Sequence, residues 1–333
     1  MPNMRELYTS VVNELEKVDF DAIWKGFTPC DFALYDNKTV YLKDGEIPWD
    51  ERFMGNTAIN IDGVSLAIWT VENPDSEDIE ILAMCIVHEM FHAFQTQQGE
   101  SRHVNEFAMF TYPHDLDNYQ LKMAENHYLA KALEENCMIN FQQFAVMRQA
   151  RKRIIGDAII QEFNAETFEG MAEYAGVMAL KQISQEKFVE DAQYQIKNIR
   201  NPDNLFNMRR MSYFTGCLLC MTLKQFGIDF HHNLSETRPL FDLIQWEQNS
   251  IETSLHKFQQ DLQSRFDNFR KSHNTKTGCN AQITGFDPMN MKRLDDEFLC
   301  DNFVVLEGEF IKGPVLLIME KDSLQQVKAY ITK

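Results

Sequence analysis

Hydrophobic residues recur every three or four positions at the start of the chain, at Met4, Leu7, Val11, Leu15 and Val18. This spacing places them on one face and predicts an amphipathic helix. Two short β-like runs follow, FALYD and TVYLK. A hairpin is then predicted where TAINI and VSLAIWTV flank the dipeptide DG, which favours a two-residue turn.

The pattern becomes helical from Asp75 and stays so for about two hundred residues. The stretch NPDSED favours a helix start, with Asp75 or Ser76 as the N-cap, and this helix should run to about Gln97. A loop rich in Gly, Ser, His and Pro follows. Further helices are expected at about 118–135, 138–153, 160–183 and 209–226, with a weaker one at about 250–270.

Short β-like runs return from Asn280 onward, in NFVVLEG, EFIKGPVLLIM and VKAYITK. No internal repeat or low-complexity linker divides the chain. We therefore expect an α+β protein in three parts, with a boundary near SHNTKTGCN. The parts are an N-terminal α+β subdomain with a small antiparallel sheet over 1–74, a mostly helical core over 75–275, and a small β-rich segment over 280–333.

The composition is that of an ordinary globular protein, with 44% hydrophobic and 25% charged residues in a chain of 333. That length allows a large core. The N-terminus lacks a basic segment followed by an apolar one, and no apolar run approaches the roughly 18 residues of a membrane span. These features predict a cytoplasmic protein with no membrane partner.

Acidic residues outnumber basic ones by 50 to 32, which gives a formal net charge of −18. Nucleic-acid-binding surfaces are basic, so no nucleic-acid partner is expected. The one dense basic cluster, RQARKR from Arg148 to Arg153, is interpreted as the solvated end of a helix. The acidity indicates solubility and would favour cationic substrates through long-range steering.

The seven cysteines are odd in number and irregularly spaced. Cys217 and Cys220 form a C-x-x-C pair, which resembles half of a zinc or redox motif. The pair lies inside the apolar run SYFTGCLLCMTL with no second pair nearby. We therefore expect reduced cysteines that serve in packing.

The run IVHEMFHAF carries the pattern H-E-x-x-H at His88, Glu89 and His92. On a helix, residues four apart share one face, so both imidazoles can reach a single metal ion. Glu89 can reach a water on that ion as a general base. The alternative is a chance match in a core helix. Burying all three polar groups without partners would cost several kcal/mol, which favours a metal site.

A second helix, in NAETFEGMAEYAGVMAL, places Glu169 and Glu173 four residues apart on one face. Two close carboxylates repel unless a cation or a donor lies between them. The alternative is a solvated acidic stripe that Glu166 continues. The many apolar residues of this helix argue against such exposure.

Together, H-E-x-x-H and the later E-G-x-A-E-Y resemble the gluzincin metallopeptidases, the thermolysin-like and aminopeptidase-like zincins. The resemblance covers roughly residues 55–226 and implies one Zn²⁺ per chain, with Glu169 as the third ligand beside His88 and His92. It implies that Glu173 orients one ligating imidazole, as second-sphere carboxylates do. Gly170 and Ala172 would let the two motif helices approach closely.

A tyrosine three residues before a glycine opens a late helix, at Tyr213 in RRMSYFTGCLLCMTL. Aminopeptidase-type gluzincins have a similar element, which implies that Tyr213 helps to hold the oxyanion. The alternative is an ordinary core tyrosine. Arg209 and Arg210 are further candidates for the oxyanion or for a substrate carboxylate, and His114 is a weaker one.

The chain departs from the family in the 76 residues that separate His92 from Glu169, a gap that we expect to hold two additional helices. No substrate-recognition motif of the aminopeptidase kind is present. The resemblance places the hairpin strand from Gly55 to Ile59 at the edge of the cleft, where it would pair with an extended peptide. Expected substrate-binding residues are Gly55, Asn56, Thr57, Ala58 and Arg210.

These features predict a zinc metallopeptidase that hydrolyses a peptide or protein substrate, with Glu89 as general base and Tyr213 as oxyanion donor. One alternative is an inactive gluzincin-like module that keeps zinc and serves in binding or regulation. Another is a di-iron helical protein, which Glu89 and His92 match in part. That class needs a second E-x-x-H, and the sequence has none.

Overall fold

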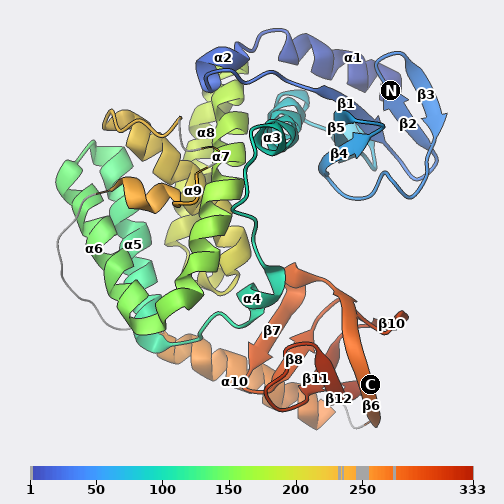
Figure 1. The fold of residues 1–333 in the computed structure, drawn as a ribbon, viewed down its shortest axis with the longest axis vertical. Helices are drawn as coiled ribbons and strands as arrows, with labels where there is room; N and C mark the ends of the chain where they lie inside the picture. The colour runs from blue at the N-terminus through green and yellow to red at the C-terminus, as the bar shows by residue number, and fades with distance from the viewer. Residues whose placement is uncertain (1–2, 232–233, 235, 245–254, 273–274, 333) are drawn as a thin grey trace.

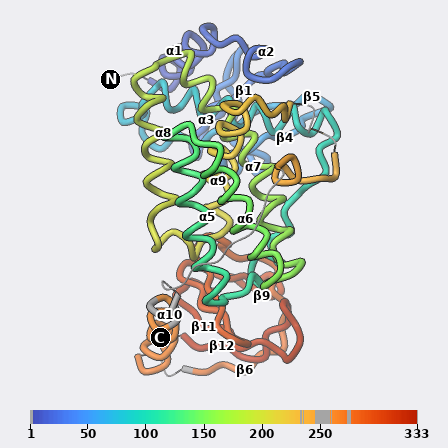
Figure 2. The backbone as a smooth tube through the Cα atoms, turned by 90° about the vertical axis from the view of Figure 1, so that its left-hand side faces the viewer, coloured from blue at the N-terminus to red at the C-terminus, as the bar shows by residue number. Residues whose placement is uncertain are grey.

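The chain is described from a computed structural model, which covers residues 3–231, 234, 236–244, 255–272 and 275–332. A layer of long helices lies between two β-sheets, one N-terminal and one C-terminal (Figure 1). Figure 2, turned by 90°, places the two sheets at opposite ends of that layer. The predicted α+β class is confirmed.

The N-terminal region contains two helices and a five-stranded sheet of order β3-β2-β1-β5-β4. An antiparallel sheet was expected, but the sheet is mixed, because β1 runs parallel to β5. The hairpin prediction is confirmed: β4 and β5 join at Asp62 and Gly63, whose φ angles of 52° and 87° suit a two-residue turn. The elements are α1 (Met4–Leu15), α2 (Phe20–Ile23), β1 (Asp31–Tyr35), β2 (Thr39–Leu42), β3 (Gly45–Pro48), β4 (Thr57–Ile61) and β5 (Val64–Thr70).

Helices α3 and α5 to α9 form the central layer, and the short helix α4 lies next to the C-terminal sheet (Figure 1). Most of these helices agree with the sequence pattern. They are α3 (Ile79–Gln97), α4 (Glu106–Phe110), α5 (Leu116–Glu135), α6 (Met138–Ile155), α7 (Ile159–Ile183), α8 (Gln185–Arg200) and α9 (Met208–Gln225). The expected pair of helices between the two motifs is present as α5 and α6. Helix α8 was not expected because only two of its residues, Gln195 and Ile199, are buried, so its pattern is mostly polar.

The predicted start of α3 is wrong. Asn73 instead caps a short 3₁₀ turn at Pro74–Ser76, and Glu77 is extended. Asp78 is the N-cap of α3, because its side chain accepts hydrogen bonds from the backbone N–H groups of Glu80 and Ile81. This stretch therefore contains two N-caps. Asn73 caps the 3₁₀ turn, and Asp78 caps α3.

Helices α7 and α9 cross at two glycines. A Cβ on Gly170 would lie 2.4 Å from Cα of Gly216, and a Cβ on Gly216 would lie 2.2 Å from the carbonyl oxygen of Glu166. Gly170 therefore faces α9, and the expectation that it serves the approach of α3 is wrong. That approach is made at Gly176, where a Cβ would lie 2.8 Å from the carbonyl oxygen of Met84.

The C-terminal region contains α10 (Leu255–Ser272) and a seven-stranded sheet of order β10-β9-β6-β12-β11-β8-β7. The helix expected at 250–270 is thus present, although 250–254 lie outside the described residues. The strands are β6 (Thr275–Phe286), β7 (Met291–Leu294), β8 (Glu297–Cys300), β9 (Phe303–Leu306), β10 (Glu309–Lys312), β11 (Val315–Met319) and β12 (Gln326–Thr332). A separate apolar core lies on this sheet.

Six charged side chains meet inside the helical layer, each at most 2% exposed: Lys122, Glu125, Arg148, Arg151, Glu162 and Glu166. Arg148 donates to Glu125 and Glu166, and Arg151 donates to Glu125 and Glu162. Three cations balance three carboxylates. The interpretation of Arg148 to Arg153 as a solvated helix end is therefore wrong for Arg148 and Arg151, which are completely buried.

All seven cysteines are unpaired, and the Cys217–Cys220 pair is buried in α9. Among the residues described, none of the helices combines the length and the apolar character that crossing a membrane requires.

Candidate metal centre

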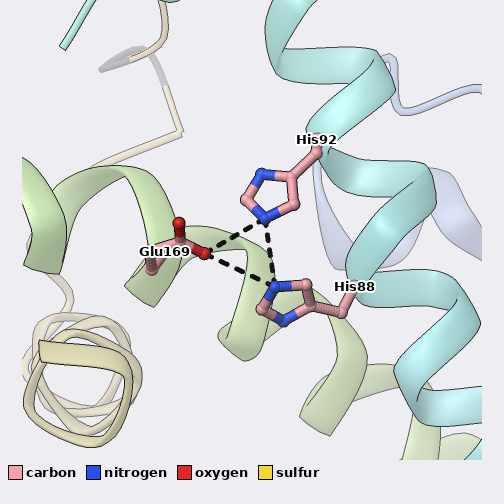
Figure 3. Close-up of side chains that lie close together, drawn as sticks. All are labelled: His88, His92 and Glu169. Atoms are coloured by element: carbon pink, nitrogen blue, oxygen red, sulfur yellow. Dashed lines mark hydrogen bonds and ion pairs between the residues drawn. The ribbon is translucent and has the colours of Figure 1, made fainter. Parts of the chain in front are cut away.

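Helix α3 carries the first half of the site. His88 and His92 lie four residues apart on one face, and their Nε2 atoms are 3.1 Å from each other. Helix α7 approaches that face and supplies Glu169, whose Oε2 lies 3.1 Å from Nε2 of His92 and 3.6 Å from Nε2 of His88. Figure 3 shows the three side chains pointing toward one another from the two helices. The structure thus brings together the three residues expected to hold a metal ion.

The outward nitrogen of each imidazole has a fixed partner. His88 Nδ1 lies 2.9 Å from Oε2 of Glu173, and His92 Nδ1 lies 2.7 Å from Oε1 of Gln95. The Gln95 amide donates to the carbonyl oxygen of Phe168 at 2.8 Å, so its oxygen is the atom that faces His92. Both acceptors favour the tautomer with a proton on Nδ1. The two Nε2 lone pairs and a Glu169 oxygen therefore point at one spot.

Such a convergence of lone pairs repels unless a positive charge lies between them. The neighbouring carboxylates also favour positive charge here. Burial lowers the pKa of His88, but hydrogen bonds to Glu169 and Glu173 raise it by more, to about 10. The pKa of Glu169 is well below its usual range, because the nearby His92, the hydrogen bonds to both histidines and Arg209 outweigh burial. A proton or a metal ion at the centre would satisfy this set.

The distances fit a tetrahedral zinc ion. Ligands at 2.0–2.1 Å from such an ion lie about 3.3 Å from one another, which matches the observed 3.1, 3.1 and 3.6 Å. Two imidazole nitrogens and one carboxylate oxygen are also a donor set of catalytic zinc sites. His88, His92 and Glu169 therefore fit the metal that the sequence implies.

Glu89 lies beside the ligands in the same cleft. Glu89 is only 7% exposed. Burial raises the pKa of its carboxyl by more than the neighbouring His88 and His92 lower it. A raised pKa makes this carboxylate a stronger base at neutral pH.

A cleft of about 520 Å³ opens over the ligands. One wall includes β4, an edge strand of the N-terminal sheet. The expected residues Thr57 and Ala58 of this strand, and Asn56 just before it, line the cleft. Gly55 does not line the cleft. Its carbonyl oxygen accepts a hydrogen bond from the Tyr35 hydroxyl at 2.7 Å, so it supports the turn before the strand.

Helix α9 supplies another part of the lining, through Arg209 and Tyr213. The ring of Tyr213 stacks on that of His88, with centroids 5.8 Å apart and planes 9° from parallel. Burial raises the pKa of Tyr213, so its hydroxyl keeps its proton. Arg209 also lines the cleft, whereas Arg210 is exposed and lies over the ring of Phe214. Arg210, expected to bind substrate, is thus not among the described residues that line the cleft.

His114 is also absent from the cleft. It lies against Tyr119 at the N-terminal end of α5, 3.0 Å from that hydroxyl, and burial lowers its pKa to about 4. Sequence reasoning missed Gln95, which is the partner of His92, and Trp69 and Phe168, which are among the residues that line the cleft. Gln95 had a usable signal, since it lies three residues after His92 on the same helix.

Comparisons of the chain with protein-family models, with curated proteins and with solved structures find no match.

Proposed function

We propose that the chain is a zinc-dependent metallopeptidase that holds one Zn²⁺ ion at His88, His92 and Glu169. The observation that carries the proposal is the convergence of two Nε2 lone pairs and one carboxylate oxygen, each 3.1–3.6 Å from the others. Glu173 and Gln95 hold the imidazoles in the tautomer that offers those lone pairs. A structural core gains nothing from such an arrangement, whereas a metal site needs it.

The ion would polarise the peptide carbonyl and lower the pKa of water. Glu89 would take the proton from the attacking water and return it to the leaving amine, as its raised pKa favours. The Tyr213 hydroxyl would donate a hydrogen bond to the oxyanion of the tetrahedral intermediate. These two side chains lie in the same cleft as the ligands.

The cleft itself supports a peptide as substrate. An edge strand offers unpaired main-chain groups, which can hold an extended peptide by β-augmentation. Strand β4 is at the edge of its sheet, and Asn56, Thr57 and Ala58 line the same cleft as the proposed ligands. The proposed compartment is the cytoplasm, in keeping with seven unpaired cysteines.

The test is the variant Glu89→Gln, which keeps the size of the side chain and removes the base. Zinc content by elemental analysis should stay at one per chain, while cleavage of a mixed peptide library, followed by mass spectrometry, should fall by about 10²–10⁴-fold. Equal cleavage by variant and parent would refute the role of Glu89. A parent that binds zinc but cleaves no peptide would favour the binding or regulatory module instead.

A further inference from the structure

The two oxygens of Glu169 have different partners. Oε2 faces Nε2 of His92 at 3.1 Å, whereas Oε1 accepts a hydrogen bond from Nη2 of Arg209 at 2.7 Å. The sequence makes Arg209 a candidate for binding the oxyanion or a substrate carboxylate, yet its guanidinium donates a hydrogen bond to a proposed metal ligand. A carboxylate can bind a metal ion through one oxygen or through both. The contact with Arg209 engages one of the two.

Arg209 is itself held firmly in place. Its Nε donates to Oε1 of Glu106 at 2.8 Å, and its guanidinium lies 5.1 Å from the centre of the Tyr213 ring. Its side chain is 17% exposed, and that of Glu169 is 6% exposed. A buried, charge-assisted pair of this kind is strong and directional. The Arg209 guanidinium therefore fixes the orientation of the Glu169 carboxylate.

Glu106 depends in turn on the C-terminal sheet. It is the first residue of the short helix α4, whose Phe107 and Phe110 contact Phe286 with ring centroids 5.2 and 4.3 Å away. Phe110 also contacts Phe298 on β8. A five-residue helix is not stable alone, so α4 and its glutamate are positioned by this aromatic contact. The C-terminal sheet thereby supports the metal centre from outside.

We propose that Arg209 is a positioning residue that keeps Oε1 of Glu169 off the metal ion, so that Glu169 binds through Oε2 alone. A catalytic zinc site has three protein ligands and one open position. A second oxygen from Glu169 would crowd that position. The proposal rests on the proposed metal centre and gives the segment α4 and the C-terminal sheet a role in keeping it open.

The experiment uses the full chain loaded with Co²⁺, whose visible absorption is intense when four ligands surround it and weaker with five or six. Arg209→Met removes the donor to Glu169. Arg209→Lys keeps the charge but lacks the separate Nε and Nη2 donors that contact Glu106 and Glu169. Glu106→Gln weakens the contact that holds Arg209. Arg200→Met is the matched control, because Arg200 forms an exposed pair with Glu134 on the surface. Circular dichroism checks that each variant is folded.

Parent and Arg200→Met should show the intense spectrum. Arg209→Met should keep one Co²⁺ per chain with a weaker absorption, and its zinc form should lose about 10–100-fold in kcat with a smaller change in KM. Arg209→Lys and Glu106→Gln should shift the spectrum in the same direction by less. If Arg209→Met does not fold, Glu106→Gln decides the question.

An unchanged spectrum in the folded Arg209 variants would overturn the role of Arg209 and leave the proposed peptidase intact. A parent that binds neither Co²⁺ nor Zn²⁺ would overturn the metal centre itself. The two failures are therefore distinguishable in one set of samples.

Discussion

Two pairs of glutamates lie along one face of α7. One pair belongs to a buried ionic network, and the other lines an open cleft. Glu162 and Glu166 join a buried network in which three protein cations balance three carboxylates. Glu169 and Glu173, one to three turns further on, contact His92 and His88 at 3.1 and 2.9 Å in an open cleft. Glu125, Glu162 and Glu166 also each place a carboxylate oxygen within 4.8 Å of the others, as the proposed ligand atoms do. Proximity of acids therefore does not by itself indicate a metal site.

What separates the clusters is the source of their positive charge. Lys122, Arg148 and Arg151 supply it within the network, whose side chains are 0–2% exposed. In the other cluster, Arg209 pairs with the outer oxygen of Glu169, while the Nε2 lone pairs stay aimed at the centre. The first cluster is neutralised by its own side chains and is closed to solvent, whereas the second leaves its lone pairs facing an open cleft.

The largest expected effect comes from removing a cation of the network, in Arg148→Met. Its two carboxylate partners, Glu125 and Glu166, would be left buried with less compensation, and breaking a buried pair in this way costs about 3–5 kcal/mol. Urea unfolding without zinc measures the loss. A loss below about 1 kcal/mol would mean that the network does not stabilise the helical layer.

His92→Ala removes one proposed zinc ligand, so it should abolish the stabilisation of the folded protein by zinc. The parent should gain about 4 kcal/mol of stability when free zinc exceeds its Kd a thousandfold, and the variant should gain none. The two zinc-free proteins should differ far less. A variant that still gained stability from zinc would place the ion elsewhere.

Acidification should affect the network in a defined pH range. Burial tends to raise the pKa of Glu125, but Arg148, Arg151 and Lys122 lower it from 4.5 to about 2, and Arg151 and Lys122 lower that of Glu162. Because the folded-state pKa is depressed, the stabilisation is complete above about pH 5 and is lost as the pH falls toward 2. Urea midpoints measured between pH 6 and 2.5 should fall over this range, and Arg200→Met should fall in parallel. A flat profile would contradict the pairing.

The smallest expected effect concerns the partner of His92. Gln95→Leu removes the acceptor of its Nδ1 proton and should weaken zinc binding by about 10–100-fold in a chelator competition. Gln95→Glu still offers an acceptor and should retain most of the affinity. Equal affinity in the leucine variant would mean that Gln95 does not orient the ligand.

The sequence predicted those elements whose pattern is periodic or whose turn is chemically distinct. The hairpin at Asp62 and Gly63 and the long helices α3, α5, α6, α7 and α9 belong to this group. The sequence-based prediction was wrong at the start of α3, where two helix-capping residues follow one another closely. It was also wrong where charged residues that were expected at the surface are buried. Arg148 and Arg151 looked solvated because their carboxylate partners lie on α5 and α7, distant in sequence.

The candidate site follows the same rule. Residues fixed by spacing on one helix, His88, Glu89 and His92, were found together as expected. Which arginine of α9 faces the cleft depends on the rotation of that helix, which the Gly170–Gly216 crossing helps to set. A sequence pattern does not contain that rotation, so Arg210 was expected where Arg209 lies.

The most direct test of the central claim is equilibrium dialysis of the apoprotein against zinc, with elemental analysis of the parent, Glu169→Gln and Glu162→Gln. The parent should bind one zinc ion per chain, Glu169→Gln should bind none tightly, and Glu162→Gln, where folded, should bind one. A parent that binds no zinc would contradict the account. So would a Glu169→Gln variant that binds zinc as tightly as the parent.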